Sequence, residues 1–561
     1  MPTIPSTLTL HGTPSSPGGR HLRAAQPFKP GDAIAYFAEP GIAIPDAPTQ
    51  ALVCNSCLLP SASTQPRLCT GCKAIAYCGV ACQKADWARV HKEECKVFRR
   101  VQTAAAGRPL PTPVRALVQM LLLTEKLESS TGLRLESHVE DFRQHSNGGD
   151  GGPERLEGPS WRDLELQAMG AVHYLGREAN PQNVASALEA ACKLQVNSFS
   201  RLDPDAGQTG LYMHPGLAMV NHSCTPSAFV QFIGRKAVLR AYRSIQKDEE
   251  VTISYIACEL HRSHRQRSLK ERYHFQCSCP RCKDDLDVYE VCQAYPHLDL
   301  NRLSLTPDLN IFRNAPTSGS FRSNGALQRV VDEIFLECTQ PLTGMDFAER
   351  SKLLGNRWEK CEPLRKNKLY AVEPLPRVLS EASIYFTELG RFSHSLAISC
   401  FLALNCDPFQ YPMPFHPFRV KGLLSVGKLI SNTGQGYATG SAQRSIDEPM
   451  ENKLKQIFDA TDSITVAQAA LMMGARWGPK AHSEEWQPYQ EAVEVLKDLE
   501  TIPGRSDEKK MLSLWAKGGQ DLEAELFFKH AVLKPVQELA SLALDIMDAE
   551  FSDQRSLVRR N

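Results

Sequence analysis

The stretch from Gly210 to Tyr255 reads GLYMHPGLAMVNHSCTPSAFVQFIGRKAVLRAYRSIQKDEEVTISY. Its densest part is Asn221–Cys224, where an amide, an imidazole, a hydroxyl and a thiol directly follow the apolar run Leu217–Val220. Such crowding of polar groups is typical of a functional site. The same residues could instead form an ordinary turn in which Asn and Ser bond the local backbone, and these four residues alone leave both interpretations open.

The rest of this stretch predicts β structure. Ala228–Ala241 and Val251–Ile256 are expected to be strands, joined through the polar turn Gln246–Glu249. Nearer the N-terminus, Ala33–Phe37 predicts a further strand between Pro and Gly breaks. Residues 1–19 are rich in Ser, Thr, Pro and Gly, and we expect them to be irregular.

Composition limits the class of protein. The 561 residues suffice for about three or four domains. The net charge of +1 gives neither the overall positive charge typical of nucleic-acid-binding proteins nor the acidic excess of a disordered chain. The longest strongly apolar run, Ala116–Leu123, is too short to span a bilayer, and the first residues lack the pattern of a signal peptide. We therefore expect no membrane association and a location in nucleus and cytoplasm. The 18 cysteines then stay reduced and favour metal binding over disulfides.

A second region, rich in candidate metal ligands, lies between residues 54 and 95. Its candidate metal ligands, in chain order, are Cys54, Cys57, Cys69, Cys72, Cys78, Cys82, His91 and Cys95. Seven thiols and one imidazole are the number of ligands that two closed tetrahedral zinc sites need. The Cys-x2-Cys spacing lets two sulfurs face one ion, and the x3 spacings place two ligands on one helix face. Because so short a segment cannot build a large apolar core, metal binding is expected to supply its folding free energy.

A third group of thiols follows a short basic helix expected at His264–Tyr273. Cys277, Cys279 and Cys282 supply three thiolates in a Cys-x-Cys-x2-Cys spacing, whereas a tetrahedral site needs a fourth ligand. Cys224 is the natural candidate because it lies in the polar tetrapeptide. One zinc ion would then join the opening stretch to the segment that follows the sheet.

Helices are predicted on both sides of the β region. Before it, Val114–Leu127, Leu164–Leu175 and Asn183–Leu194 have helical periodicity, with a Gly-rich loop expected at Ser146–Gly152. After residue 300, amphipathic helices are expected at Leu327–Glu337, Val378–Leu389, His394–Leu404, Val420–Ile430, Glu451–Asp459, Tyr489–Leu499 and Glu523–Met547. The turn near Gly390 resembles that of a tetratricopeptide repeat, which favours a stack of helix pairs over an unrelated bundle.

Together these motifs resemble the SET and MYND domain-containing protein-lysine methyltransferase family. The block from Cys54 to Cys95 is similar to a MYND zinc module, Gly210–Tyr255 to a SET core, and Phe275–Cys282 to a post-SET segment. The resemblance implies a multi-domain α+β fold, in which a SET β-fold is split by the zinc module and a helical insert and is followed by an all-α TPR-like domain. The implied parts are 1–50 (N-terminal SET segment), 51–98 (MYND module), 99–195 (helical insert), 196–258 (core SET), 259–290 (post-SET zinc segment) and 300–561 (helical C-terminal domain).

The resemblance also implies a function and site residues. The expected activity is transfer of a methyl group from S-adenosylmethionine to a lysine of a histone or another protein, with Tyr255 orienting the methyl group and the amine. The residues expected to contact the donor are Gly19, Arg20, His21, Asn197, Asn221, His222, Tyr255 and Phe275. Three zinc ions are implied: one on Cys54, Cys57, Cys78 and Cys82, one on Cys69, Cys72, His91 and Cys95, and one on Cys224, Cys277, Cys279 and Cys282.

Two positions depart from the family pattern, and alternatives remain. His21 stands where a glycine is usual, and Ser227 stands where an asparagine is usual, which puts donor binding in question. The alternative function is a catalytically weak or inactive adaptor that binds proline-rich partners through the MYND module. Basic runs near residues 67–100 and 262–272 leave nucleic-acid binding open, although such runs more often form solvated helix faces. We expect a monomer.

Overall fold

The computed structural model describes residues 4–13, 19–59, 65–104, 109–131, 135–147, 159–294, 303–305, 325–338, 342, 344–439, 448–518 and 521–551. The chain forms two compact units. The first comprises residues 1–256 and 265–279, and the second comprises residues 257–264 and 280–561. Most of the Gly-rich stretch Ser146–Gly152, expected to be a loop, lies outside the described residues.

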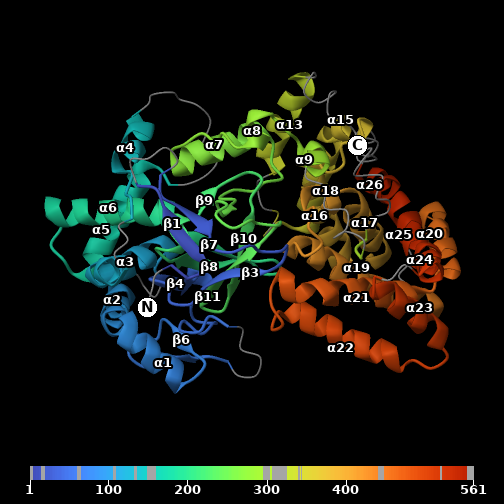
Figure 1. Ribbon diagram of the computed structural model, residues 1–561, viewed down its shortest axis with the longest axis horizontal. Helices are drawn as coiled ribbons and strands as arrows, with labels where there is room; N and C mark the ends of the chain where they lie inside the picture. The colour runs from blue at the N-terminus through green and yellow to red at the C-terminus, as the bar shows by residue number, and fades with distance from the viewer. Residues whose placement is uncertain are drawn as a thin grey trace. The chain divides into compact units, whose positions relative to one another are not determined.

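Small separate sheets characterise the first unit (Figure 1). In sheet order, the described strands are β1 (Leu8–His11) with β2 (His21–Ala24); β10 (Ala228–Ile233), β11 (Lys236–Ala241) and β3 (Ala33–Phe37); β12 (Thr252–Ile253) with β9 (Asn221–His222); β4 (Ile42–Pro45), β8 (Gly207–Met213) and β7 (Phe199–Asp203); and β5 (Arg67–Leu68) with β6 (Ala76–Tyr77). With the surrounding helices, they confirm the predicted α+β class. Strand β1 shows that the expectation of an irregular N-terminus was wrong at Leu8–His11, which pairs antiparallel with β2.

The predicted strand Ala228–Ala241 is a hairpin of two strands, β10 and β11, which is a correction. The chain reverses at Gly234, whose φ is +53°, a left-handed conformation that glycine adopts at little cost. A Cβ atom there would lie 2.8 Å from the carbonyl oxygen of Cys57, so the loop of the cysteine block approaches this turn closely. The alternating apolar pattern correctly predicted β structure, but the single Gly between its two halves marks a turn between two strands.

The pairing of β9 with β12 brings the two ends of the opening stretch together. These strands are parallel, with Asn221 opposite Thr252 and His222 opposite Ile253. The backbone N–H of Ser223 also donates to the carbonyl oxygen of Ile253 at 2.9 Å. Tyr255 therefore lies next to the polar tetrapeptide, although more than thirty residues separate them in sequence.

Helices of the first unit lie together beside the sheets (Figure 1). They are α1 (Val80–Asp86), α2 (Lys92–Ala104), α3 (Thr112–Thr131), α4 (Val139–Asn147), α5 (Trp161–Leu175) and α6 (Pro181–Asn197), and α7 (Arg262–Tyr273) begins in the second unit. A π-helical turn, Trp87–His91, joins α1 to α2. Helix α5 starts with a capping box between Ser160 and Asp163, which satisfies free N–H groups of its first turn.

The described part of the second unit is helical. Its helices are α8 (Pro280–Lys283), α9 (Val288–Ala294), α13 (Gly325–Cys338), α14 (Phe347–Lys360), α15 (Glu362–Lys366), α16 (Leu375–Glu388), α17 (Phe392–Asn405), α18 (Asp407–Gln410), α19 (Pro417–Thr439), α20 (Glu448–Ala460), α21 (Ser463–Ala481), α22 (Gln487–Thr501), α23 (Ser506–Ala516), α24 (Leu522–Phe528), α25 (Lys534–Ser541) and α26 (Ala543–Phe551). Helices α16 and α17 pack against each other after a turn at Gly390, whose φ is +76°.

The expectation of one helix over Glu523–Met547 was wrong. A π-helical turn, Lys529–Leu533, separates α24 from α25, and α26 begins at Ala543. Pro535, at the start of α25, lacks the N–H that an uninterrupted helix would use, which favours a break there. Within the described helices, none combines the length and apolar character needed to cross a membrane.

Candidate functional site

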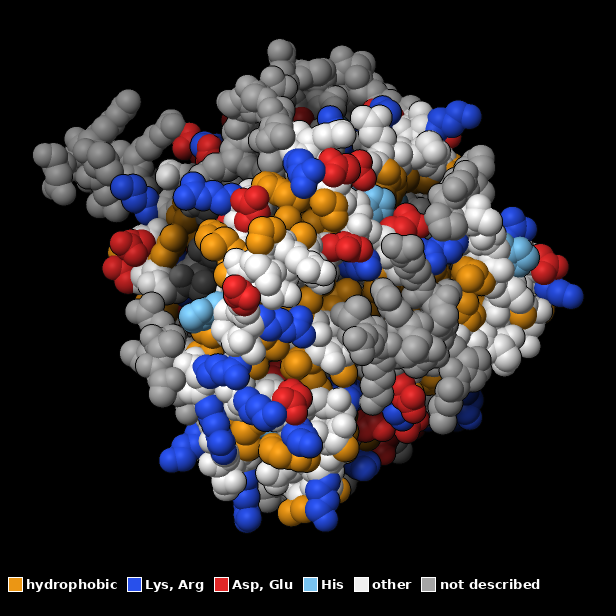
Figure 2. Space-filling model, turned by 90° about the vertical axis from the view of Figure 1, so that its left-hand side faces the viewer, with side chains coloured by type: hydrophobic (Ala, Val, Ile, Leu, Met, Phe, Trp, Pro, Cys, Tyr) orange, Lys and Arg blue, Asp and Glu red, His pale blue; other side chains and the backbone are white. Residues whose placement is uncertain are grey.

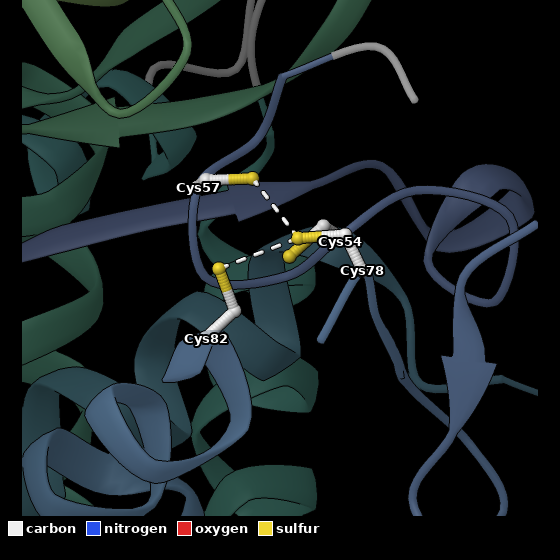
Figure 3. A group of neighbouring side chains, drawn as sticks. All are labelled: Cys54, Cys57, Cys78 and Cys82. Carbon is white, nitrogen blue, oxygen red and sulfur yellow. Dashed lines mark hydrogen bonds between the residues drawn. The ribbon is translucent and has the colours of Figure 1, made fainter. Parts of the chain in front are cut away.

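The first group of candidate ligands consists of Cys54, Cys57, Cys78 and Cys82, whose sulfur atoms point toward one another (Figure 3). The Cys78 sulfur lies 3.9 Å from that of Cys57 and 3.4 Å from that of Cys82. Cys54 and Cys57 lie on one loop, and Cys82 comes from the first turn of α1. Cys78 is exposed. Four thiolates at these spacings can hold one ion in tetrahedral geometry.

The second group consists of Cys69, Cys72, His91 and Cys95, all of them buried. The Nε2 atom of His91 lies 3.4 Å from the sulfur of Cys69 and 3.7 Å from that of Cys72. His91 ends the π-helical turn, and Cys95 lies one helical turn later on α2, so both face the Cys69–Cys72 loop. The structure thus sorts the eight residues of the block into the two sets that the resemblance implies.

A buried carboxylate lies behind His91. The Nδ1 atom of His91 lies 3.3 Å from Oε2 of Glu94. Burial alone would raise the pKa of Glu94, but the Arg115 charge and hydrogen bonds from His91 and Arg115 outweigh it and lower this pKa to about 2. Asp86 is also near His91, but it already accepts a hydrogen bond from Tyr77 and pairs with Arg89. These carboxylates therefore support the second group rather than form another metal site.

The third group comprises Cys224, Cys277, Cys279 and Cys282, whose sulfur atoms all lie within 4.8 Å of one another. The sulfurs of Cys224 and Cys277 are 4.0 Å apart. The prediction of three groups able to hold a metal ion is confirmed for the described residues, and cysteine thiolates in sets of four suit zinc.

His222 connects the third group to Tyr255. Its Nε2 atom lies 3.3 Å from the Cys224 sulfur, and its Nδ1 atom accepts a hydrogen bond from the backbone N–H of Tyr255 at 3.0 Å. Because Nδ1 accepts, the proton is on Nε2, which points at the sulfur. Burial lowers the pKa of His222 to about 4, so the ring is neutral near pH 7. Both ring nitrogens of His222 therefore have contacts within the chain.

Tyr255 stands in a cluster of rings. Its centroid lies 4.8 Å from that of Tyr273, 5.3 Å from that of His222 and 6.5 Å from that of Phe275. Its hydroxyl donates to the Val220 carbonyl oxygen at 2.7 Å. Burial, followed by the neighbouring Tyr273, raises the pKa of Tyr255, which keeps it a neutral phenol. Sequence reasoning missed Tyr273, although its position two residues before Phe275 could have suggested it.

Residues of the N-terminal loop and Asn197 meet at Glu136. Arg20 pairs with the Glu136 carboxylate at 3.3 Å, and the Asn197 amide donates to the Glu136 carbonyl oxygen at 3.2 Å and to that of Lys193 at 2.8 Å. The Nε atom of Arg20 is buried and lacks a hydrogen-bond partner among the described residues. Gly19 has a φ of +64° and open space where a Cβ atom would stand.

The remaining predicted residues take local partners. His21 lies 3.4 Å from the Gly19 carbonyl oxygen through Nδ1 and accepts from Arg23 at Nε2. The Asn221 amide donates to Glu250 at 3.1 Å. Ser227 is fully buried, and its hydroxyl oxygen accepts from the N–H of Thr252 at 2.9 Å, so the shorter residue still bonds the backbone.

Comparison with known proteins shows which family part of this chain resembles. Residues 19–256 match the family model described as SET domain. This part of the chain is therefore similar to a SET domain. The chain is 31% identical to histone-lysine N-methyltransferase ASHR1 of Arabidopsis thaliana over 49% of this chain and 56% of that protein. It is 33% identical to SET domain and MYND-type zinc finger protein 6 of Schizosaccharomyces pombe over 42% and 44%, and 28% identical to histone-lysine N-methyltransferase SMYD3 of Mus musculus over 53% and 73%.

These relatives confirm the resemblance to SET and MYND domain proteins. The chain matches about half the length of the first two relatives, 56% and 44%. The solved structure of the SET domain of LSMT aligns with 10% identity over 93% of this chain and 94% of that chain, at a TM-score of 0.26.

Proposed function

We propose that this chain is a protein-lysine N-methyltransferase that uses S-adenosylmethionine. The observation that carries the proposal is the pairing of β9 with β12, which places Tyr255 beside His222 in a ring cluster with Tyr273 and Phe275. The names of relatives in Arabidopsis thaliana and Mus musculus, both called histone-lysine N-methyltransferase, support the same activity. The substrate that we propose is a lysine of a histone or another protein.

The chemistry suits such a ring cluster. S-adenosylmethionine supplies a methyl group on a sulfonium ion, and the attacking lysine amine must be neutral. Apolar ring faces disfavour an ammonium ion and so lower the pKa of a lysine that lies among them. Because the hydroxyl proton of Tyr255 is held by the Val220 carbonyl oxygen, lone pairs of the phenol oxygen remain to orient an incoming amine. The remaining acceleration comes from alignment in a water-poor site.

The residues of the N-terminal loop fit a donor with a carboxylate and an amine. The buried Nε of Arg20, which has no hydrogen-bond partner among the described residues, can donate to a carboxylate. The open space at Gly19 allows close approach of a ligand to the backbone. We propose that these two residues bind the donor together with His21, Asn197, Asn221, His222, Tyr255 and Phe275.

The test combines product detection with donor binding. Wild-type protein, incubated with labelled donor and with histones or lysate proteins, is expected to yield methyl-lysine by mass spectrometry. Tyr255→Phe is expected to lower turnover by roughly 100-fold or more, as loss of one oriented polar group does. Calorimetry with S-adenosylhomocysteine should give nearly unchanged affinity. Tyr36→Phe is the matched control, because Tyr36 is 61% exposed. Absence of both methyl-lysine and binding heat in zinc-replete wild-type protein would refute the proposal.

We also propose that residues 51–98, the cysteine module, bind a proline-rich protein segment. Such binding would be useful to an adaptor and to an enzyme alike. Among the described residues of the module, five large apolar side chains are exposed: Leu52 at 69%, Leu59 at 43%, Leu68 at 48%, Val80 at 66% and Trp87 at 43%. An exposed Trp is the kind of side chain on which proline rings pack. Loss of peptide binding in Trp87→Ala, with donor binding unchanged, would support this role. Equal binding by the variant would exclude it.

Nucleic-acid binding is a second proposal for the module. Lys and Arg side chains gather on the lower part of the face shown in Figure 2. Exposed basic residues of the module and of the two residues that follow it are Arg67, Lys73, Lys84, Lys92, Lys96, Arg99 and Arg100. DNA affinity that falls steeply with salt would support such binding, and no detectable complex at low salt would exclude it. For the whole protein we further propose a monomer in nucleus and cytoplasm, which light scattering and cell fractionation would test.

A further inference from the structure

The buried carboxylate of Glu94 occupies an unusual position between two parts of the first unit. It lies on α2, one residue before the candidate ligand Cys95, and its side chain is fully buried. Oε2 faces Nδ1 of His91 at 3.3 Å. Thus the ring of a candidate metal ligand contacts the cysteines through one nitrogen and a carboxylate through the other.

The other partners of Glu94 come from α3, in the helical insert. Arg115 donates from Nε to Oε1 at 2.8 Å and from Nη2 to Oε2 at 3.2 Å, and Gln119 donates to Oε1 at 2.8 Å. Arg115 is 1% exposed. Its Nη1 also donates to Oδ1 of Asn55, next to Cys54, at 2.8 Å. An ion pair with Glu94 and a hydrogen bond to Asn55 therefore join the insert to residues adjacent to both candidate metal groups of the module.

Stability alone does not explain this ion pair. Removing two charges from water costs so much that apolar residues of similar volume often serve equally well. A carboxylate behind a metal-binding histidine has a specific effect: it accepts a hydrogen bond from the N–H of one ring nitrogen and so leaves the other nitrogen as the ligand. Here it would hold Nε2 toward the sulfurs of Cys69 and Cys72.

We propose that Glu94 is a positioning residue for the second metal group and that Arg115 holds it in place, so that metal retention in the cysteine module depends on α3 of the insert. The residues of this group, three thiols and one imidazole, fit zinc. The first group consists of Cys54, Cys57, Cys78 and Cys82 and contains no histidine for a carboxylate to orient, so it serves as an internal reference.

Two double variants of the full chain distinguish two roles of Glu94: orienting His91, and only attaching the cysteine module to α3. Glu94→Gln with Arg115→Met removes both charges but keeps an oxygen that can accept from His91. Glu94→Leu with Arg115→Met removes the charges and the acceptor, with similar side-chain volumes. Glu93→Gln is the matched control, because Glu93 is the exposed neighbour on the same helix. Each protein is equilibrated with graded chelator, the free cysteines are alkylated, and peptides are quantified by mass spectrometry.

The Leu-containing double variant is expected to release metal from the second group at roughly 10- to 100-fold lower chelator strength than the Gln-containing one. That change should appear as selective alkylation of Cys69, Cys72 and Cys95. Equal release by the two double variants, or equal gains in alkylation at both groups, would overturn the proposal. If neither double variant folds, Gln119→Leu, which leaves the ion pair in place, decides: a smaller selective loss supports the proposal, and no loss refutes it.

Discussion

The two candidate metal groups of the cysteine module have similar ligands but different surroundings. The first group includes an exposed cysteine, Cys78, and its ligands come mainly from loops. The second group is buried throughout, and its histidine is backed by Glu94 and Arg115. The difference teaches that ligand spacing specifies a site, whereas residues outside the ligand set decide how firmly that site is attached to the rest of the fold.

Metal removal should have the largest effect on stability, and the two metal groups should differ in how easily they lose metal. Structural zinc sites contribute about 10–16 kcal/mol of apparent binding free energy near pH 7, so a strong chelator should unfold the module. Because Cys78 is exposed and the second group is buried, the first group should lose metal at lower chelator strength. Hydrogen exchange should then rise first near Cys57 and later near Cys95, while α17 keeps its protection. The reverse order would show that burial does not control retention.

Breaking the ion pair on one side should have the next largest effect. Arg115→Met leaves the buried Glu94 carboxylate without its cation, which is expected to destabilise the first unit by about 3–5 kcal/mol. Urea unfolding followed by tryptophan fluorescence would measure this loss. Arg67→Met, at an exposed arginine of the same module, is the control and should change little. If Arg115→Met were as stable as wild type, the network would be dispensable for folding.

Removing a single hydrogen bond near the second group should cost less. The Tyr77 hydroxyl donates to the buried carboxylate of Asp86 at 2.7 Å. Tyr77→Phe is expected to destabilise the unit by about 1.5–3 kcal/mol, the usual range for a hydrogen bond to a charged group. Thermal unfolding would measure the loss, with Tyr36→Phe as the exposed control. A loss as large as that of Arg115→Met would show that the ion pair with Arg89 does not compensate for loss of the Tyr77 hydroxyl at Asp86.

Much of the module could be predicted from sequence, because metal chemistry restricts spacing. The number of ligands between Cys54 and Cys95 and the place of Cys224 in the third set follow from ligand chemistry, whereas the division of the eight ligands into two sets came from the resemblance to a MYND module. The α+β class was also predictable, since alternating and helical apolar patterns are local signals.

What sequence could not show depends on contacts between distant residues. Nothing near Glu94 in the sequence points to Arg115, because their pairing arises only when α3 packs beside the module. Tyr273 was missed for the same reason: its neighbour Tyr255 belongs to another segment. Gly234 can be read from the sequence as a candidate turn residue. The sequence does not show why a glycine is needed there, which is the close approach of the Cys57 carbonyl oxygen.

The smallest effect is expected at a charged pair on the surface of the same helix. Lys96 and Glu93 lie 2.7 Å apart on α2, and both are about half exposed. Solvent screens such pairs, and holding two long side chains together costs entropy, so Lys96→Ala should leave unfolding and metal release unchanged within error. Glu93 and Glu94 are adjacent carboxylates that differ in burial. If Lys96→Ala has no effect and Arg115→Met has a large one, burial explains why the two ion pairs differ in their contribution to stability. A measurable loss in Lys96→Ala would mean that charge on α2, wherever it lies, supports the second metal group.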